Sequence, residues 1–127
     1  VITSISFRSG GGAGTPTNQW FALYDSSLNL LRQTTDDTTT AWGTTTFKTL
    51  NLTSTYTTTA AGLFYVGIMV KATTVPTLRG LTIALTNVTN LAPILYGQTS
   101  DTGLTDTAPN PSGSITASTV MTYAYVS

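Results

Sequence analysis

The stretch NQWFALYDSSLNLLRQ, residues 18–33, decides the fold that this sequence predicts. Its two apolar runs, 19–25 and 28–34, each have the length of a strand, and two serines separate them. Asp25 and these serines can hydrogen-bond to their own backbone, as residues of a tight turn between strands do. The stretch therefore predicts a β-hairpin.

The rest of the chain also reads as short strands and turns, without an amphipathic helix. The clearest further strand is 63–73, which is apolar on both faces up to Lys71, as is typical of a central strand in a sandwich. Pro93 restricts the run 92–97 to a short or edge strand. The other expected strands are 1–9, 44–52, 80–89 and 114–127, and 98–114 is expected to be a long loop.

About eight or nine short strands predict one all-β domain over 1–127. The expected architecture is an antiparallel β-sandwich of jelly-roll type, and an immunoglobulin-type sandwich is the alternative. Within it, 1–17 reads as an N-terminal strand followed by a glycine-rich linker, GGGAG at 10–14. The chain begins at Val1 without Met or a signal peptide, which indicates a processed product, an excised domain or a piece of a longer protein.

Charge and composition exclude several functions. The net charge is zero, and the five basic residues are scattered along the chain, so phosphate contacts to nucleic acid are not expected. No run of 18 apolar residues occurs, so membrane insertion is not expected either. The chain has no Cys and no His, which removes thiolate catalysis, the usual metal ligands and the commonest general base. We expect neither an enzyme nor a cofactor.

Threonine makes up about a quarter of the chain, and there is no Glu. Threonine favours strands and gives them a neutral, hydrogen-bonding outer face. At 40% hydrophobic residues the chain is too apolar for mucin-like disorder. Because soluble monomers usually carry more surface charge, this surface suits one covered by neighbours in a homo-oligomer.

Asp36 and Asp37 form the one adjacent acidic pair. Carboxylates near threonine hydroxyls and carbonyl oxygens are ligands that Ca²⁺ prefers, but calcium sites usually collect three or more such groups at set spacings. The alternative interpretation, a solvated loop tip, is the stronger one.

Asp101-Thr102-Gly103 matches the DTG tripeptide of aspartic proteases, in which two carboxylates share a proton. That tripeptide should follow an apolar strand, whereas here it follows the polar residues 97–100. A three-residue match in a chain rich in Thr and Gly is close to chance. The five aspartates also lack a context that suggests a glycosidase pair.

The aromatic residues give the best candidates for contacts. Trp42 lies in a polar loop, where an exposed indole could stack on a sugar or a partner, although packing against the sandwich edge is at least as good an interpretation. By strand alternation, one of Trp20 and Phe21 should lie in the core and the other should face outwards. Tyr123 and Tyr125 share a face, which suits a core wall or a subunit contact.

Two stretches carry a family resemblance: NQWFALYDSSLNLLRQTTDDTTTAW (18–42) and FKTLNLTSTYTTTAAGLFYVGIMVKATTVPTLRG (47–80). They resemble β-sandwich domains of minor tail, fibre and capsid-surface proteins of tailed bacteriophages, especially those that infect actinobacteria. The closing TYAYVS (122–127) is similar in style to the ends of such chains. The resemblance covers 18–127 and brings no catalytic motif.

The resemblance implies a non-enzymatic module on the virion surface, with other virion proteins and a host-surface glycan as partners. Trimers are common in phage fibres, so the resemblance also implies a homotrimer. A carbohydrate-binding module of a secreted bacterial protein is the alternative. The contact residues expected on either interpretation are Trp42, Trp20, Asp36 and Asp37.

Overall fold

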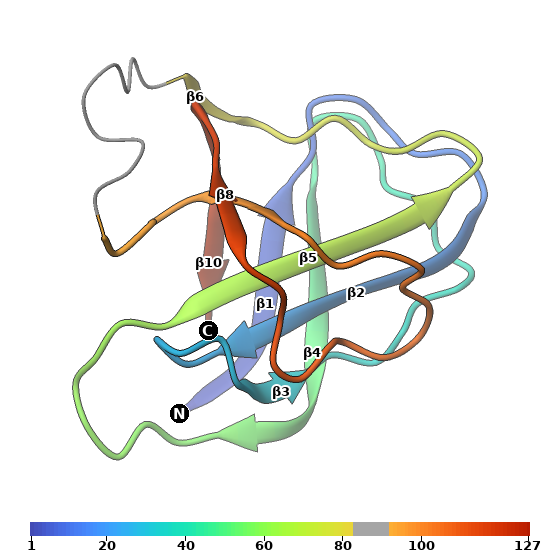
Figure 1. The fold of residues 1–127 in the computed structure, drawn as a ribbon. Coiled ribbons are helices and arrows are strands. Elements are labelled where there is room, and N and C mark those ends of the chain that lie inside the picture. Colours follow the sequence, from blue (N-terminus) through green and yellow to red (C-terminus); the bar gives the residue numbers. More distant parts are fainter. Residues whose placement is uncertain (83–91) are drawn as a thin grey trace.

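The computed structural model describes residues 1–82 and 92–127, and this part of the chain is all-β, without a helix (Figure 1). The strands, in chain order, are β1 (Ile2–Arg8), β2 (Pro16–Tyr24), β3 (Leu30–Gln33), β4 (Phe47–Tyr56), β5 (Tyr65–Ala72), β6 (Gly80–Thr82), β7 (Gly97–Thr99), β8 (Ile115–Ala117), β9 (Val120–Thr122) and β10 (Ala124–Val126). Two antiparallel three-stranded sheets, β10-β1-β4 and β3-β2-β5, make the fold sandwich-like. Two small sheets, β6-β9 and β7-β8, accompany them. The predicted strand 80–89 appears as β6, and its remainder lies outside the described residues.

The predicted hairpin is confirmed, since β2 and β3 pair antiparallel with Ala22 opposite Gln33. One carboxylate oxygen of Asp25 accepts hydrogen bonds from the backbone N–H groups of Ser27 (2.8 Å) and Asn29 (2.9 Å). The expected side-chain-to-backbone bonds thus form the turn. The second strand begins two residues later than expected, at Leu30.

The strand predicted at 63–73 is confirmed as β5, but its predicted central position is wrong. Within the described residues β5 is an edge strand, and β2 occupies the centre, between β3 and β5. Val66, Ile68 and Val70 pack against the core, whereas Tyr65 and Met69 pack against a second cluster on the other face. Both faces are apolar because each meets a different apolar cluster.

The main core lies between the two three-stranded sheets. Phe21 of β2 is fully buried and contacts Phe7 of β1, with ring centroids 4.9 Å apart. Trp42 packs edge-on against Phe21 at 5.9 Å and 88°. Ile5 and Leu52 complete the wall between the sheets. Burial of this one cluster joins strands that are distant in sequence.

A second apolar cluster covers the opposite face of β2. Trp20, Ala22 and Tyr24 are buried there against Ala108, which belongs to the segment 100–113. The prediction that one of Trp20 and Phe21 faces outwards is therefore wrong. Their side chains do alternate, but a segment some 80 residues later covers the second face.

The glycine-rich segment 10–14 is held by backbone hydrogen bonds along its length. Gly10 N–H donates to the carbonyl oxygen of Thr77 at 2.7 Å, and Gly14 N–H donates to that of Thr74 at 2.8 Å. Between them, Ala13 N–H donates to the carbonyl oxygen of Trp42 at 3.1 Å. This segment thereby fixes the loop that carries Trp42.

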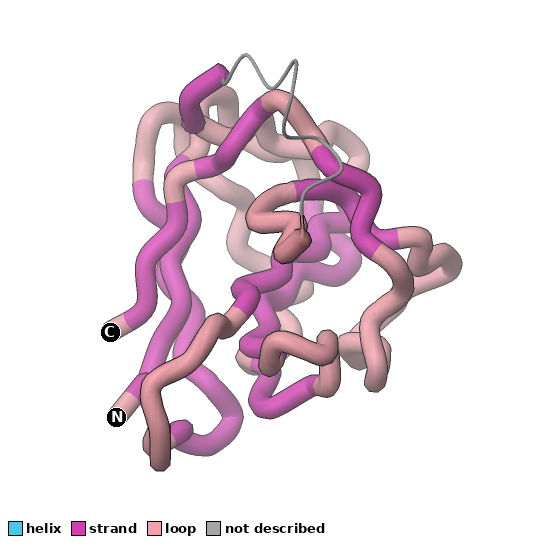
Figure 2. Tube along the Cα trace, turned by 60° about the vertical axis from the view of Figure 1, so that its left-hand side comes forward, coloured by secondary structure: helices cyan, strands magenta, loops and turns pink. Residues whose placement is uncertain are grey.

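The single strand predicted at 114–127 is wrong in detail, because the segment forms three short strands. β8 pairs with β7, β9 pairs with β6, and β10 pairs with β1, so each strand has a different partner. The β1–β10 pairing places both chain ends on the same side of the molecule (Figure 2). Thr3 N–H donates to the carbonyl oxygen of Ser127 at 2.5 Å, and the Ser4 and Ser127 hydroxyls are 2.7 Å apart.

Candidate functional site

The carboxylates of Asp36 and Asp37 bind other residues of the same chain. Asp36 accepts hydrogen bonds from Gln19 N–H (2.7 Å) and from the Asn18 side-chain amide (2.6 Å). Asp37 forms a salt bridge with Lys48 through one oxygen, and its other oxygen accepts from the N–H groups of Thr39 and Thr40. Each carboxylate oxygen of this pair accepts a hydrogen bond or salt bridge from the chain, so both carboxylates have a structural role in holding this loop.

These contacts lower the pKa of Asp37. Partial burial on its own raises the pKa, but the hydrogen bonds from Lys48 and from the Thr40 and Thr39 N–H groups outweigh it and lower the pKa to about 2. Asp37 therefore links the loop 37–40 to β4 as a permanently ionised group at neutral pH.

Both tryptophan side chains are buried. Trp42 is 3% exposed and lies in the main core, in agreement with the interpretation that it packs against the sandwich edge. Trp20 is also 3% exposed, and its indole nitrogen donates a 2.8 Å hydrogen bond to the carbonyl oxygen of Thr105. Neither indole offers an exposed stacking surface for a sugar or a partner.

Asp101 of the DTG tripeptide closes the loop that follows it. Its carboxylate accepts hydrogen bonds of 3.0 Å from the Ser112 hydroxyl and from Gly113 N–H. Gly103, with φ of 68°, provides the left-handed turn that the loop needs. In this chain the carboxylate thus joins the two ends of the segment 101–113.

Three exposed aromatic rings form a patch on the outer side of the sheet β10-β1-β4. Phe47, Tyr123 and Tyr125 are 44%, 56% and 43% exposed, and we call them the aromatic face. The Phe47 ring lies 5.8 Å from Tyr123 and 5.5 Å from Tyr125, with tilts of 61° and 70°. The Arg8 guanidinium stands 5.5 Å over the Phe47 ring, within cation–π range.

A groove of about 520 Å³ continues the aromatic face across β6 and β9. Leu81 and Met121, both exposed, line it together with Tyr123. Arg8 and Arg79 also line it, and no carboxylate does so among the described residues. This part of the surface is apolar and aromatic, with two positive charges.

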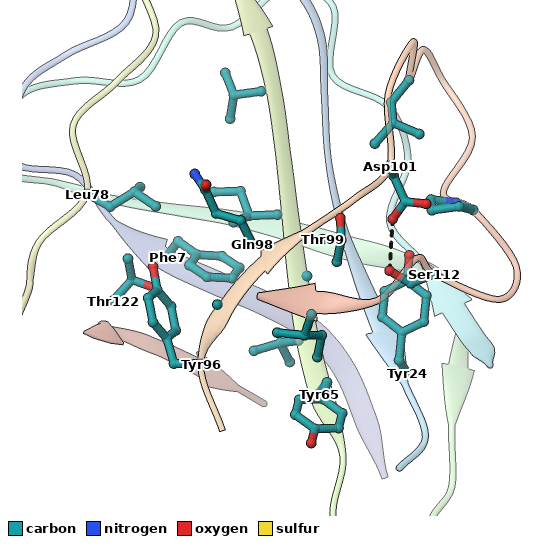
Figure 3. A pocket seen from close by; sticks show the side chains of 18 of the residues that line it. Phe7, Tyr24, Tyr65, Leu78, Tyr96, Gln98, Thr99, Asp101, Ser112 and Thr122 are labelled. Atoms are coloured by element: carbon teal, nitrogen blue, oxygen red, sulfur yellow. Dashed lines mark hydrogen bonds between the residues drawn. The ribbon is translucent and has the colours of Figure 1, made fainter. Parts of the chain in front are cut away.

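A larger cavity of about 590 Å³ lies along β5, beside β7 and the segment 100–113 (Figure 3). Its lining includes Trp20 and Tyr65 of the second cluster as well as Phe7 and Ile68 of the main core. Its walls are mostly apolar and aromatic, and Trp20, Tyr24, Tyr65 and Tyr96 contribute to them. Among the described residues that line it, Asp101 is the only charged one. Burial, and secondly the nearby Asp101 carboxylate, raise the pKa of Tyr24 to about 12.

The sequence predicted part of the aromatic face, but neither the groove nor the cavity. The spacing of Tyr123 and Tyr125 placed them on one face. Phe47 joins them only through the pairing of β1 with β4, in which Arg8 lies opposite Phe47. The cavity depends on a loop that packs on β2 although it lies about 80 residues later in the sequence. A local sequence pattern cannot predict such a contact.

Comparison with protein-family models, with curated proteins and with solved structures found no significant match for this chain. In the part that the structure describes, no group of three or more acidic residues could hold a metal ion. Within the same residues, no helix is long and apolar enough to cross a membrane.

Proposed function

We propose that this chain is a non-enzymatic structural module of a phage virion surface, which docks through the aromatic face onto a neighbouring protein subunit. The observation that carries this proposal is the exposure of Phe47, Tyr123 and Tyr125 on one side of a sheet. Tyr, Phe, Met and Arg are enriched in the centres of protein interfaces, and a contiguous exposed apolar patch marks an interaction site. The virion setting rests on the sequence resemblance.

Charge favours a partner surface unlike the aromatic face itself. In a two-fold dimer through this face, the Arg8 and Arg79 pairs of two copies would meet without a carboxylate to balance them. A contact between two different surfaces avoids this repulsion. Asp25 and Asp106 lie in the turn and loop that close over the other sheet, and can supply such an acidic surface on a second copy.

A contact between different surfaces closes into a ring when the rotation between subunits allows it. A trimeric ring, as expected from the resemblance, joins the aromatic face of each copy to the acidic loop end of the next. The sparse surface charge of this chain agrees with a surface that neighbouring subunits cover.

Light scattering on the isolated chain at micromolar concentrations tests the proposal. We expect an oligomer that dissociates in the double variant Phe47→Ser/Tyr123→Ser. The matched control is Leu63→Ser, which removes an exposed leucine (37% exposed) from a loop outside the aromatic face and should leave the oligomer intact. A wild-type chain that stays monomeric, or a double variant that still assembles, contradicts docking of copies through this face.

A carbohydrate-binding module is the second candidate, because the exposed rings of Tyr123 and Tyr125 carry hydroxyl groups. Sugar platforms usually present ring faces for stacking. Here the rings are tilted by 61° and 70° to Phe47, so they do not form one flat platform, and this geometry favours a protein partner. Retention on an insoluble polysaccharide, abolished in Phe47→Ser/Tyr123→Ser, would support the carbohydrate function instead.

A further inference from the structure

The cavity has the size and lining of a small-molecule site. Ligand pockets of 300–1,000 Å³ with apolar and aromatic walls and a few polar groups are typical of proteins, and this one measures about 590 Å³. Four aromatic rings line it: Trp20, Tyr24, Tyr65 and Tyr96. Tyr96 lies on the other side of β5 from Tyr24 (Figure 3). The aromatic face lies outside this cavity.

The charge of the cavity is unbalanced. Asp101 is the one charged residue that lines it, and no Lys or Arg does so among the described residues. The single described salt bridge, Lys48–Asp37, involves other residues. Asp101 is only partly buried, so water screens part of its attraction for a cation.

The Asp101 carboxylate is held in place by the chain. It accepts hydrogen bonds from the Ser112 hydroxyl through one oxygen and from Gly113 N–H through both, so most of the about four acceptor positions of its two oxygens are used, and it offers a ligand chiefly its negative charge. These bonds also fix the carboxylate beside Tyr24 (Figure 3). Burial raises the pKa of Asp101, but hydrogen bonds from Gly113, Thr99 and Ser112 outweigh it and lower the pKa below its usual value. The group is therefore ionised at neutral pH.

We propose that this cavity binds a small organic cation, an ammonium group carried on a compact apolar body, with Asp101 as its counter-ion. The ring of Tyr24, which lies on the same side of the cavity as Asp101 (Figure 3), and that of Tyr65 are aromatic walls that can meet such a cation with their negative faces. Quaternary and substituted ammonium groups are held in proteins by this combination of aromatic rings and a carboxylate. The proposal is independent of docking through the aromatic face.

The choice of a cation over a neutral sugar rests on the unpaired charge. Sugar hydroxyls would need free acceptor positions on the carboxylate, and those of Asp101 are largely used by Ser112 and Gly113. A quaternary ammonium group needs only the negative charge. A ligand with one positive charge neutralises Asp101 within the cavity. An uncharged isostere of the cation tests whether binding needs the positive charge.

The test is calorimetric titration of the protein with choline and with 3,3-dimethylbutan-1-ol, in which carbon replaces the quaternary nitrogen. Tetramethylammonium and benzylamine extend the probe set, and glucose tests the neutral sugar. We expect choline or another ammonium probe to bind at least about tenfold more tightly than the neutral compounds, a ratio that falls as salt is added.

Asp101→Asn keeps the shape of the side chain and should weaken ammonium binding by about tenfold or more. The matched control is Asp106→Asn, which removes a carboxylate of the same loop that does not line the cavity and should leave binding unchanged. Tyr65→Leu should also weaken binding, and thermal unfolding verifies that each variant is folded.

Three results would overturn the proposal: equal binding of choline and its neutral isostere, tighter binding of glucose, or no binding of any ammonium probe at millimolar concentration. Phe47→Ser/Tyr123→Ser should bind the ammonium probe like the wild type. Assembly is thus tested with Phe47→Ser/Tyr123→Ser and ligand binding with Asp101→Asn, so either proposal can be contradicted without the other.

Discussion

The indole nitrogen of Trp20 donates a hydrogen bond of 2.8 Å to the carbonyl oxygen of Thr105, 85 residues later in the chain. The same ring packs in one cluster with Ala108 and Leu104. Together these contacts hold the segment 100–113 over β2. The roof of the cavity is therefore attached to the central strand of its sheet through one side chain.

Trp20→Phe should lower the free energy of unfolding by about 2 kcal/mol, because it removes this bond, leaves the Thr105 carbonyl unsatisfied and reduces the packed volume. Urea denaturation measures the loss. Trp42→Phe is the control, since it removes the same atoms from a nitrogen without a hydrogen-bond partner among the described residues. Equal losses for the two variants would contradict the role of the Thr105 bond.

Thr34→Val should lower the free energy of unfolding by about 1–3 kcal/mol. The Thr34 hydroxyl accepts a 2.9 Å hydrogen bond from the buried N–H group of Phe21, and valine keeps the shape but leaves this donor unsatisfied. Chemical denaturation measures the loss. Thr35→Val changes the exposed neighbouring threonine and should be close to neutral, so a similar cost at both positions would point to strand propensity instead.

Stability should fall between about pH 4 and pH 2 in a step that depends on Asp37. The pKa of Asp37 is about 2 in the folded chain, below the usual value of about 4, so its contribution is complete above pH 4 and is lost as the pH falls through 2. The melting temperature measured across this range reports the step. In Asp37→Asn the step should shrink, and an unchanged profile would show that other carboxylates dominate acid unfolding.

One tyrosine should titrate late in the folded chain. The pKa of Tyr24 is about 12, against about 10 in the unfolded chain, so stability is intact below pH 10 and declines as the pH rises towards 12. Phenolate absorbance near 295 nm measures the titration. The late phase should disappear in Tyr24→Phe and move to lower pH in Asp101→Asn, which removes the nearby negative charge. A single phase near pH 10 for all tyrosines would be incompatible with a buried Tyr24 hydroxyl.

The elements set by neighbouring residues were predictable from the sequence. The hairpin of β2 and β3 depends on two apolar runs and on Asp25, whose carboxylate makes the expected turn bonds. The strands β1 and β5 follow from their apolar pattern in the same way. The all-β class follows from the repetition of such local signals.

What the sequence could not reveal depends on contacts between distant segments. Alternation placed Trp20 and Phe21 on opposite faces, but only the packing of the segment 100–113 buries both. The apolar run of β5 did not distinguish a central strand from an edge strand with an apolar cluster on each face. The run 114–127 divides into three strands because β7, β6 and β1, which pair with it, come from separate parts of the chain.

The pairing of β1 with β10 also determines how the fold would respond to a pulling force. Val126 lies opposite Ile5 in an antiparallel register, and Thr3 N–H is bonded to the carbonyl oxygen of Ser127. A force that separates residues 1 and 127 therefore loads these inter-strand hydrogen bonds one after another, as in opening a zipper. Tension transmitted through both of these residues would peel β10 from the sheet at low force. Load applied through the faces of the sheets would instead act on the whole core at once.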